Sequence, residues 1–198
     1  MNAETDQLRL WRSDFGRAYT DRNDAARLER VDVWRRVLEG IPPGSALEVG
    51  CNVGWNLTYL SQLGWTDVHG VEPQAYAVSR AFRRAPELHI VQGDAFALPF
   101  ADASMDLVFT SGVLIHIAPE SLSGALSEIY RVSRRYIVAI EYDAPSEVAL
   151  SYRGEQGALW KRDHGAVWQA AYPDLAKLRT IVLGDEYDNC TAHVLEKR

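Results

Sequence analysis

Short apolar runs alternate with amphipathic stretches along most of the chain. The runs predict buried strands, and apolar residues spaced three and four positions apart predict helices. The predicted strands cover residues 45–50, 68–71, 88–91, 106–110, 136–141, 178–183 and 191–195. The predicted helices cover residues 24–39, 56–63, 73–84 and 119–133. This alternation predicts one α/β domain over residues 1–198, with helices on both faces of a mostly parallel sheet.

The last two predicted strands differ from the others in their connection. Only residues 184–190 separate them. A parallel pair needs a crossover of a dozen or more residues, so this pairing is expected to be antiparallel. The sequence therefore predicts a Rossmann-like fold with a seven-stranded, mostly parallel sheet whose last strand is antiparallel.

Composition and charge narrow the class of protein. Of the 198 residues 47% are apolar and 24% are charged, which is ordinary for a globular domain. The net charge of −6 argues against a nucleic-acid partner, because phosphate binding needs a basic surface. The basic groups Arg83-Arg84 and Arg131, Arg134 and Arg135 fall near predicted helix ends, where cations complement the helix dipole. The pattern carries no signal for an oligomeric state.

Targeting and cysteine signals point to the cytoplasm. Residues 1–11 lack the apolar core of a signal peptide, and no apolar stretch approaches the length of a membrane span. Cys51 and Cys190 form no disulfide framework, and neither has a second Cys or a His at metal-ligand spacing. We therefore expect a protein of a reducing compartment without a membrane partner or a metal site.

A glycine-containing turn follows the first predicted strand and opens a helix. Glycine there lets the backbone approach a ligand closely, and the helix offers unpaired N–H groups. A dinucleotide-binding turn would read G-x-G-x-x-G, but its third and sixth positions are Asn52 and Trp55 here. A nicotinamide-dependent oxidoreductase is therefore disfavoured. The candidate cofactor-binding residues of this turn are Glu48, Gly50, Cys51, Asn52 and Gly54.

Three further elements follow later strands in order. Glu72, followed by Pro73, ends the second strand, where an acidic residue can accept hydrogen bonds from both ribose hydroxyls. Asp94 and Ala95 follow the third strand, where they can contact an adenine ring. The segment 110–116, which includes Ser111, lies at the tip of the fourth strand and would border a reacting methyl group.

These four elements in order resemble class I S-adenosylmethionine-dependent methyltransferases over about residues 45–141. A closer resemblance, over nearly the whole chain, is to the methylases associated with pseudaminic acid biosynthesis. The resemblance implies S-adenosylmethionine as cofactor and a sugar or another small metabolite as methyl acceptor. One departure is Asn52, where a third glycine is usual; asparagine tolerates the left-handed conformation, so cofactor binding is expected to survive. The segments that carry the closer resemblance are Phe15-Gly-Arg-Ala-Tyr-Thr-Asp-Arg-Asn23, Gly112-Val-Leu-Ile-His-Ile117, Ser151-Tyr-Arg-Gly154 and Trp160-Lys-Arg-Asp163.

Two segments outside these motifs are candidate covers of the site. Residues 1–40 contain the first predicted helix, capped by Asp24, and an arm that would act as a lid. In that lid Tyr19 would cover the cofactor and Arg22 would pair with its carboxylate; the alternative is an exposed arm. Residues 141–173 form an insertion of about thirty residues, long for a loop and so a candidate cover of the substrate site. The alternative for the insertion is a solvated helix pair whose tryptophans pack on the sheet.

The candidate catalytic residues are His116, at the tip of the fourth strand, and Arg153 and Lys161 in the insertion. His116 could act as a general base or be a packed structural residue, and the two cations could hold an acid or phosphate of the substrate. Asp143, Asp163 and His164 lack a convincing metal-ligand set, so no metal site is predicted. We expect methyl transfer to O or N of a small polar metabolite, and the resemblance implies a sugar or nucleotide sugar as the acceptor class. The alternative is a non-catalytic S-adenosylmethionine-binding partner of a biosynthetic enzyme.

Overall fold

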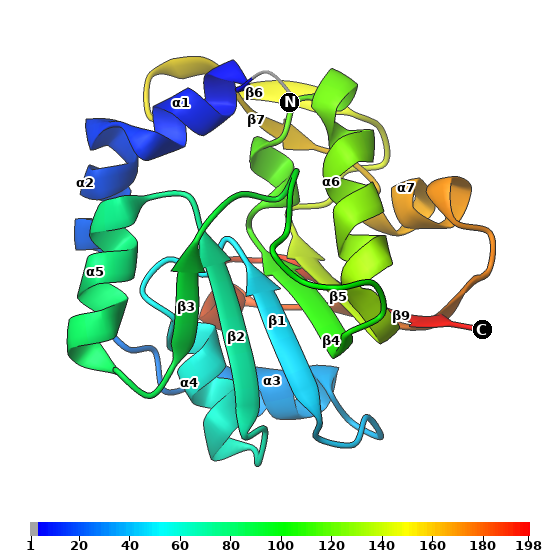
Figure 1. The fold of residues 1–198 in the computed structure, drawn as a ribbon. Helices are drawn as coiled ribbons and strands as arrows, with labels where there is room; N and C mark the ends of the chain where they lie inside the picture. Colours follow the sequence, from blue (N-terminus) through cyan, green and yellow to red (C-terminus); the bar gives the residue numbers. More distant parts are fainter. Residues whose placement is uncertain (1–3) are drawn as a thin grey trace.

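A seven-stranded sheet forms the centre of the computed structural model, which describes residues 4–198 (Figure 1). The strand order is β3-β2-β1-β4-β5-β9-β8. β1 to β5 pair in parallel, whereas β9 runs antiparallel to both β5 and β8. The predicted fold, with its antiparallel last strand, is confirmed. The strands are β1 (Ser45–Val49), β2 (Asp67–Glu72), β3 (His89–Gln92), β4 (Met105–Ser111), β5 (Ser133–Glu141), β8 (Leu175–Val182) and β9 (Thr191–Lys197).

Helices cover both faces of this sheet because the central strands are apolar on both sides. In β4, Leu107 and Phe109 pack with the core formed by α3 (Arg30–Val37) and α4 (Trp55–Gln62), whereas Val108 packs with the core of the opposite face. That opposite core includes buried residues of α6 (Pro119–Val132) and α7 (His164–Ala171). α5 (Ala75–Arg84) packs beside β2 and β3. A near-continuous apolar strand is typical of a parallel sheet covered twice.

The chain before the sheet contains two helices that the apolar pattern does not predict. They are α1 (Asp6–Arg12) and α2 (Asp14–Arg22), and Ser13 between them caps α2 by accepting from the N–H of Phe15. The prediction of a helix starting at Asp24 is wrong, because α3 begins only at Arg30. Asp24 instead pairs with Arg80, and its carbonyl oxygen accepts a hydrogen bond from the indole of Trp55. These tertiary contacts compete with a capping role.

The segment 141–173 is a β-hairpin followed by one helix, not a helix pair. β6 (Val148–Tyr152) and β7 (Glu155–Lys161) pair antiparallel as a separate two-stranded sheet. Their turn contains Arg153 and Gly154, both with positive φ. Trp160 in β7 and Trp168 in α7 are buried. In Figure 1 this hairpin lies beside α1, at the end of the molecule where the parallel strands terminate.

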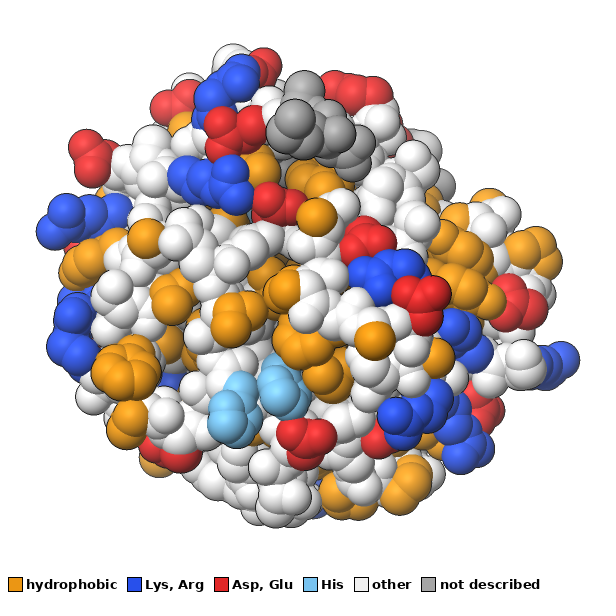
Figure 2. Space-filling view, viewed as in Figure 1, with side chains coloured by type: hydrophobic (Ala, Val, Ile, Leu, Met, Phe, Trp, Pro, Cys, Tyr) orange, Lys and Arg blue, Asp and Glu red, His pale blue; other side chains and the backbone are white. Residues whose placement is uncertain are grey.

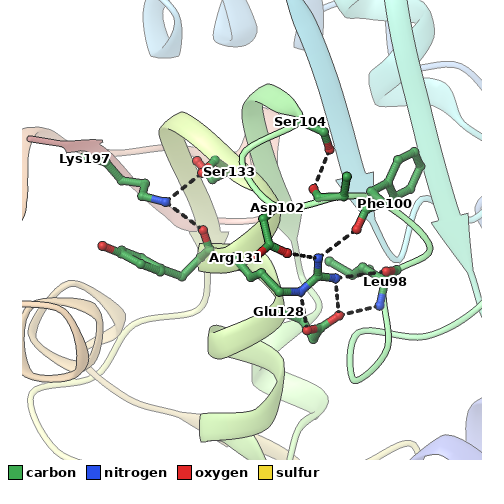
Figure 3. Close-up of polar contacts among 10 residues, drawn as sticks. Leu98, Phe100, Asp102, Ser104, Glu128, Arg131, Ser133 and Lys197 are labelled. Carbon is green, nitrogen blue, oxygen red and sulfur yellow. Dashed lines mark hydrogen bonds and ion pairs between the residues drawn. The ribbon is translucent and has the colours of Figure 1, made fainter.

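Arg131 at the end of α6 has a structural role, as its place near a helix end suggests. Its guanidinium donates to the carbonyl oxygens of Leu98 and Phe100 and pairs with Glu128 and Asp102 (Figure 3). Arg134 and Arg135 likewise pair with Asp106 and Glu196. On the face that Figure 2 shows, basic and acidic side chains are interspersed rather than gathered into a basic patch. Among residues 4–198 no helix has the length and apolar character needed to cross a bilayer.

Candidate functional site

A cavity of about 310 Å³ lies at the carboxyl ends of β1, β2 and β4, between the sheet and helices α1 and α2. In open α/β sheets ligands bind at this end of the strands. The cavity brings together most of the residues that the sequence singles out. Three candidates, Gly54, Arg153 and Lys161, are not among its lining residues. The predicted residues that line it are Tyr19, Arg22, Glu48, Gly50, Cys51, Asn52, Glu72, Pro73, Asp94, Ala95, Ser111 and His116.

The turn after β1 has the backbone geometry that its sequence suggests. Gly50 has φ +76°, and a Cβ on it would lie 2.6 Å from a methyl carbon of Val113, so only glycine fits. Asn52 has φ +48°, the left-handed conformation that asparagine tolerates better than most residues. The side chain of Asn52 also accepts a hydrogen bond from the hydroxyl of Thr20 in α2 at 3.0 Å. The departure from glycine therefore leaves the turn intact and links it to the second helix.

Glu72, at the end of β2, has both carboxylate oxygens fixed by backbone donors. Oε2 accepts from the N–H of Asn52 at 2.7 Å, and Oε1 accepts from the N–H of Gln74 at 2.8 Å. Burial raises the pKa of Glu72 to about 7, although the two N–H donors act in the opposite direction. Each carboxylate oxygen retains a second acceptor position. The group can therefore accept two hydroxyl donors from a ligand in the cavity.

Glu48, in β1, is buried with one oxygen unpartnered. Oε1 accepts from the side-chain amide of Asn56 at 2.6 Å, whereas Oε2 has no hydrogen-bond partner within residues 4–198. Burial raises the pKa of Glu48 to about 8, and nearby Glu72 adds to the shift. A buried polar atom without a partner is costly. Oε2 is therefore suited to a cationic or N–H donor supplied by a ligand.

Sequence reasoning missed the hydrogen-bonded chain that supports Glu48. The Oδ1 atom of Asn56 accepts from the hydroxyl of Tyr187 at 3.0 Å, and that hydroxyl lies 3.0 Å from the hydroxyl of Ser111. Arg30, which lines the cavity, stacks over the Tyr187 ring at 4.1 Å and pairs with Asp188 at 2.5 Å. Tyr187 and Asp188 belong to the turn before β9, so no local pattern connects them with the turn after β1.

Helices α1 and α2 form the roof of the cavity. Gln74 donates from its side-chain amide to the carbonyl oxygens of Trp11 and Ser13, at 3.1 and 2.9 Å. Arg12 reaches Oδ2 of Asp94 at 3.0 Å. A Cβ on Gly16 would lie 1.9 Å from the Trp11 carbonyl oxygen, so glycine is required where the two helices meet. Trp11, another residue that the sequence did not single out, lies over the cavity at this joint.

Aromatic rings surround His116 at the cavity wall. The centroid of Trp11 lies 4.7 Å from that of His116 and 5.1 Å from that of Tyr19, and Tyr152 of the hairpin lies 5.0 Å from His116. Tyr19 is half-buried, and desolvation of its hydroxyl raises its pKa above the ordinary value. The arm, the hairpin and the loop after β4 therefore meet at one aromatic cluster of Trp11, Tyr19, His116 and Tyr152.

His116 presents a neutral ring. Its Nδ1 lies 2.6 Å from the carbonyl oxygen of Ala158, an acceptor, so Nδ1 carries the proton and donates it. Burial lowers the pKa of His116 to about 4, although the bond to Ala158 opposes this shift. Among the described residues nothing hydrogen-bonds to Nε2. The unprotonated Nε2 can therefore accept a proton or a hydrogen bond from a bound molecule.

Arg153 and Lys161 stand apart from the cavity. Arg153 is exposed at the hairpin turn, with its guanidinium 5.8 Å from the centroid of Tyr152. The ammonium of Lys161 lies 5.2 Å from the ring of Tyr142, which follows β5. Each cation lies beside an aromatic ring and does not line the cavity. Their predicted contact with a substrate remains a prediction.

A polar cluster lies where β9 meets α7. Possible ligand atoms of Asp143, Asp163 and His193, rather than the His164 considered from the sequence, lie within 4.8 Å of one another. His193 is 2.7 Å from Asp143, and Asp163 caps α7 by accepting from the N–H of Ala166. Burial lowers the pKa of His164 to about 3. Oδ1 of Asp143 and both ring nitrogens of His164 have no hydrogen-bond partner within residues 4–198. We assign no metal to this cluster.

Comparison with known proteins agrees with this geometry. A family model described as a methyltransferase domain matches residues 47–136. The chain is 36% identical over 139 residues to a demethylmenaquinone methyltransferase of Beutenbergia cavernae, covering 67% of this chain and 56% of that protein. It is 30% identical over 175 residues to a malonyl-[acyl-carrier protein] O-methyltransferase of Serratia marcescens, covering 85% of this chain and 64% of that protein. The chain thus spans about half the length of the first curated relatives it matches.

Solved structures show the same fold at low sequence identity. The 1,6-didemethyltoxoflavin N1-methyltransferase of Burkholderia thailandensis, solved with its substrate and S-adenosylhomocysteine, aligns with a TM-score of 0.76 at 16% identity, covering 100% of this chain and 91% of that one. The magnesium protoporphyrin IX methyltransferase of Synechocystis, solved with S-adenosylmethionine, gives 0.75 at 17% identity and covers 100% of both chains. These structures show the fold. The family match over residues 47–136 and the 36% identical relative show that the chain carries a class I, S-adenosylmethionine-dependent methyltransferase domain.

Proposed function

We propose that this protein transfers the methyl group of S-adenosylmethionine to an oxygen or nitrogen of a small polar metabolite. The observation that carries the proposal is the cavity in which the carboxylates of Glu48 and Glu72 lie at the ends of adjacent strands. Both are buried, and both have acceptor capacity left for a ligand. The cofactor would supply an electrophilic sulfonium methyl, and the protein supplies position and the exclusion of water.

The polar groups of the cavity support this cofactor, because there is a candidate partner for its ribose, its adenine, its ammonium and its carboxylate. Glu72 would accept the two ribose hydroxyls, and the unpartnered Oε2 of Glu48 would accept the ammonium of the methionine portion. Asp94 and Ala95, which follow β3 beside β2, also line the cavity and would contact the adenine. Arg22 and Arg30 both line the cavity and offer guanidinium groups for the methionine carboxylate, in addition to the Arg22 contact expected from the sequence.

His116 is placed to serve the methyl acceptor. It lines the same cavity, and its Nε2 is unprotonated because Nδ1 donates to Ala158. An acceptor hydroxyl or N–H that donates to Nε2 would be oriented for in-line attack and could release its proton there. Burial lowers the pKa of His116 to about 4, so the ring is neutral at pH 7 and its role at the acceptor is mainly to accept a hydrogen bond and orient it.

A sugar or nucleotide sugar is the proposed acceptor class. The resemblance of segments 15–23, 112–117, 151–154 and 160–163 to the methylases associated with pseudaminic acid biosynthesis supports it. The rings of Trp11 and Tyr152 offer apolar faces for the C–H surface of a sugar. Arg153, at the hairpin turn beside Tyr152, would meet a carboxylate or phosphate of such a molecule.

Calorimetric titration of the purified protein with S-adenosylmethionine and S-adenosylhomocysteine, with NADH as control, tests the cofactor. We expect micromolar binding of the first two and none of NADH. A screen of sugars and nucleotide sugars for formation of S-adenosylhomocysteine then tests the acceptor. Absence of binding by either adenosyl compound would overturn the proposal. Binding without turnover on any acceptor would favour a non-catalytic partner of a biosynthetic enzyme.

A further inference from the structure

We propose that Glu141 and Arg162 are positioning residues that hold the loop after β4 so that His116 faces the cavity. The inference rests on the proposed function in one respect, the use of His116 at the methyl acceptor. It extends to residues that line no part of the cavity. Arg162 falls within the segment Trp160-Lys-Arg-Asp163, but the sequence assigns a role to neither residue.

Glu141 holds the amino end of the loop. It is the last residue of β5 and is fully buried. Oε1 accepts from the N–H groups of Val113 and Leu114, each at 3.2 Å, and Oε2 accepts from that of Ile115 at 3.3 Å. These are the donors that a helical turn leaves unpaired at its amino end, here the 3-10 turn Leu114–His116. A single carboxylate therefore fixes the three residues directly before His116.

Arg162 holds the carboxyl end of the same loop. It follows β7, and only 2% of it is exposed. Nη1 donates to the carbonyl oxygens of Leu114 and Ile117, each at 3.3 Å, and Nη2 donates to that of Ile117 at 3.2 Å. Its Nε lies 3.0 Å from a carboxylate oxygen of Glu147. The planar guanidinium thus contacts carbonyls on both sides of His116.

The ring itself is fixed by a third contact from the same part of the chain. Nδ1 of His116 donates to the carbonyl oxygen of Ala158 in β7. Glu141, Ala158 and Arg162 all belong to the segment that leaves β5 and forms the hairpin. This segment therefore controls both the backbone and the tautomer of His116, without itself lining the cavity.

A stabilising role alone does not account for this arrangement. Buried charges pay a large desolvation penalty, and well-packed apolar residues in their place are often as stable. Here Glu141 and Arg162 do not pair with each other. They hydrogen-bond to three backbone N–H groups and two carbonyl groups of one short loop. Such contacts specify one geometry of the loop, which is what a residue presented to a reacting atom requires.

Side-chain NMR of histidine-labelled protein bound to S-adenosylhomocysteine tests the inference directly, because exchange of the His116 Nδ1 proton with water reports the contact with Ala158. Glu141→Gln places an amide donor against backbone N–H groups, and Arg162→Lys loses the planar fork. We expect each to accelerate this exchange at least about tenfold, with S-adenosylhomocysteine affinity within about twofold of wild type. Glu128→Gln is the matched control, because Glu128 also accepts from a backbone N–H and an arginine, but it lies in α6. It should leave the exchange unchanged.

Unchanged exchange in both folded variants would overturn the inference. If Arg162→Lys does not fold, Glu147→Gln replaces it, because Glu147 is 44% exposed and its ion pair within residues 4–198 is with the Nε of Arg162. We expect a smaller acceleration in the same direction, and its absence would remove the Arg162 role. Failure of the wild type to bind S-adenosylhomocysteine would count against the proposed function instead, and the same exchange measured without ligand would still test the positioning.

Discussion

The side-chain amide of Gln74 donates a hydrogen bond to the carbonyl oxygen of Trp11 in α1, at 3.1 Å. The same amide also donates to Ser13, while the backbone N–H of Gln74 donates to Glu72. One residue therefore links the roof of the cavity to the carboxylate proposed to bind the ribose. Any movement of the roof must break the two side-chain bonds.

Gln74→Asn should loosen the roof without unravelling α5. Gln74 caps that helix by accepting from the N–H of Tyr76, a role that asparagine also performs, but the shorter side chain does not reach Trp11. Two hydrogen bonds of about 1 kcal/mol each are lost, so S-adenosylhomocysteine should dissociate several times faster in a stopped-flow chase. Gln92→Asn, which shortens an exposed glutamine near Pro73, is the control. Equal dissociation from wild type and Gln74→Asn would show that the roof is not held here.

Glu72→Ala should weaken S-adenosylmethionine binding at least about tenfold, or about 1.4 kcal/mol. The substitution removes the proposed ribose contacts and the two backbone anchors at Asn52 and Gln74. Titration calorimetry measures the affinity, and circular dichroism checks that the fold persists. Wild-type affinity in a folded Glu72→Ala protein would refute the ribose assignment.

The buried carboxylates make stability depend on pH in a defined direction. The pKa of Glu48 is raised to about 8, so the folded state favours its protonated form, and this contribution to stability is lost as pH rises from about 4.5 through 8. Glu48→Gln abolishes the loss. The ligand-free variant should therefore gain at least about 1 kcal/mol relative to wild type between pH 6 and pH 9, measured by denaturant unfolding. A constant difference between the two proteins over this range would contradict the shifted pKa.

The same shift predicts how binding responds to pH. S-Adenosylmethionine brings positive charge beside Glu48, whose pKa is raised to about 8, and Glu72, whose pKa is raised to about 7. Binding should therefore release protons and tighten between pH 6 and pH 8. Calorimetry in buffers of different ionisation enthalpy counts the protons. S-Adenosylhomocysteine keeps the ammonium proposed to meet Glu48, so it should release protons as well. Absence of proton release with both ligands would place the pH effect elsewhere.

Arg153→Ala should spare the cofactor and affect only the acceptor. The side chain lies at the hairpin turn, outside the cavity lining. We expect S-adenosylhomocysteine affinity within about twofold of wild type and a lower kcat/KM on any acceptor found by the screen. Glu155→Gln, at the other side of the same turn, controls for disturbance of the hairpin. A parallel loss of cofactor affinity would move Arg153 to the cofactor.

The fold was predictable because its signals are local. Glu48 and Glu72 lie near the ends of β1 and β2, and Asp94 follows β3. Each of these strands is predicted from a short apolar run followed by a turn, so the order of motifs along the chain places the three residues at the carboxyl ends of the strands. The helices α1 and α2 lack such a signal. Residues 6–22 show no clear apolar stripe, and the helices depend on the caps Thr5 and Ser13 and on docking to Gln74.

The parts of the site that were missed come from tertiary contacts. Asn56, Tyr187 and Arg30 are brought to Glu48 by the packing of α3, α4 and the turn before β9. Glu141 was read only as the end of a strand, because its partners lie 26 to 28 positions away along the chain. Hydrogen bonds to backbone groups leave no residue pattern, which is why the positioning of His116 could not be read from the sequence.

The strand order has a consequence for how this molecule can diversify. The chain that leaves β5 adds no strand to the sheet until it returns as β8, the edge strand beyond β9. The hairpin of β6 and β7 can therefore lengthen, shorten or change its outer side chains without altering the register of any other strand. As long as the contacts of Glu141 and Arg162 are kept, the hairpin can vary between related proteins while the sheet and the cofactor cavity stay the same.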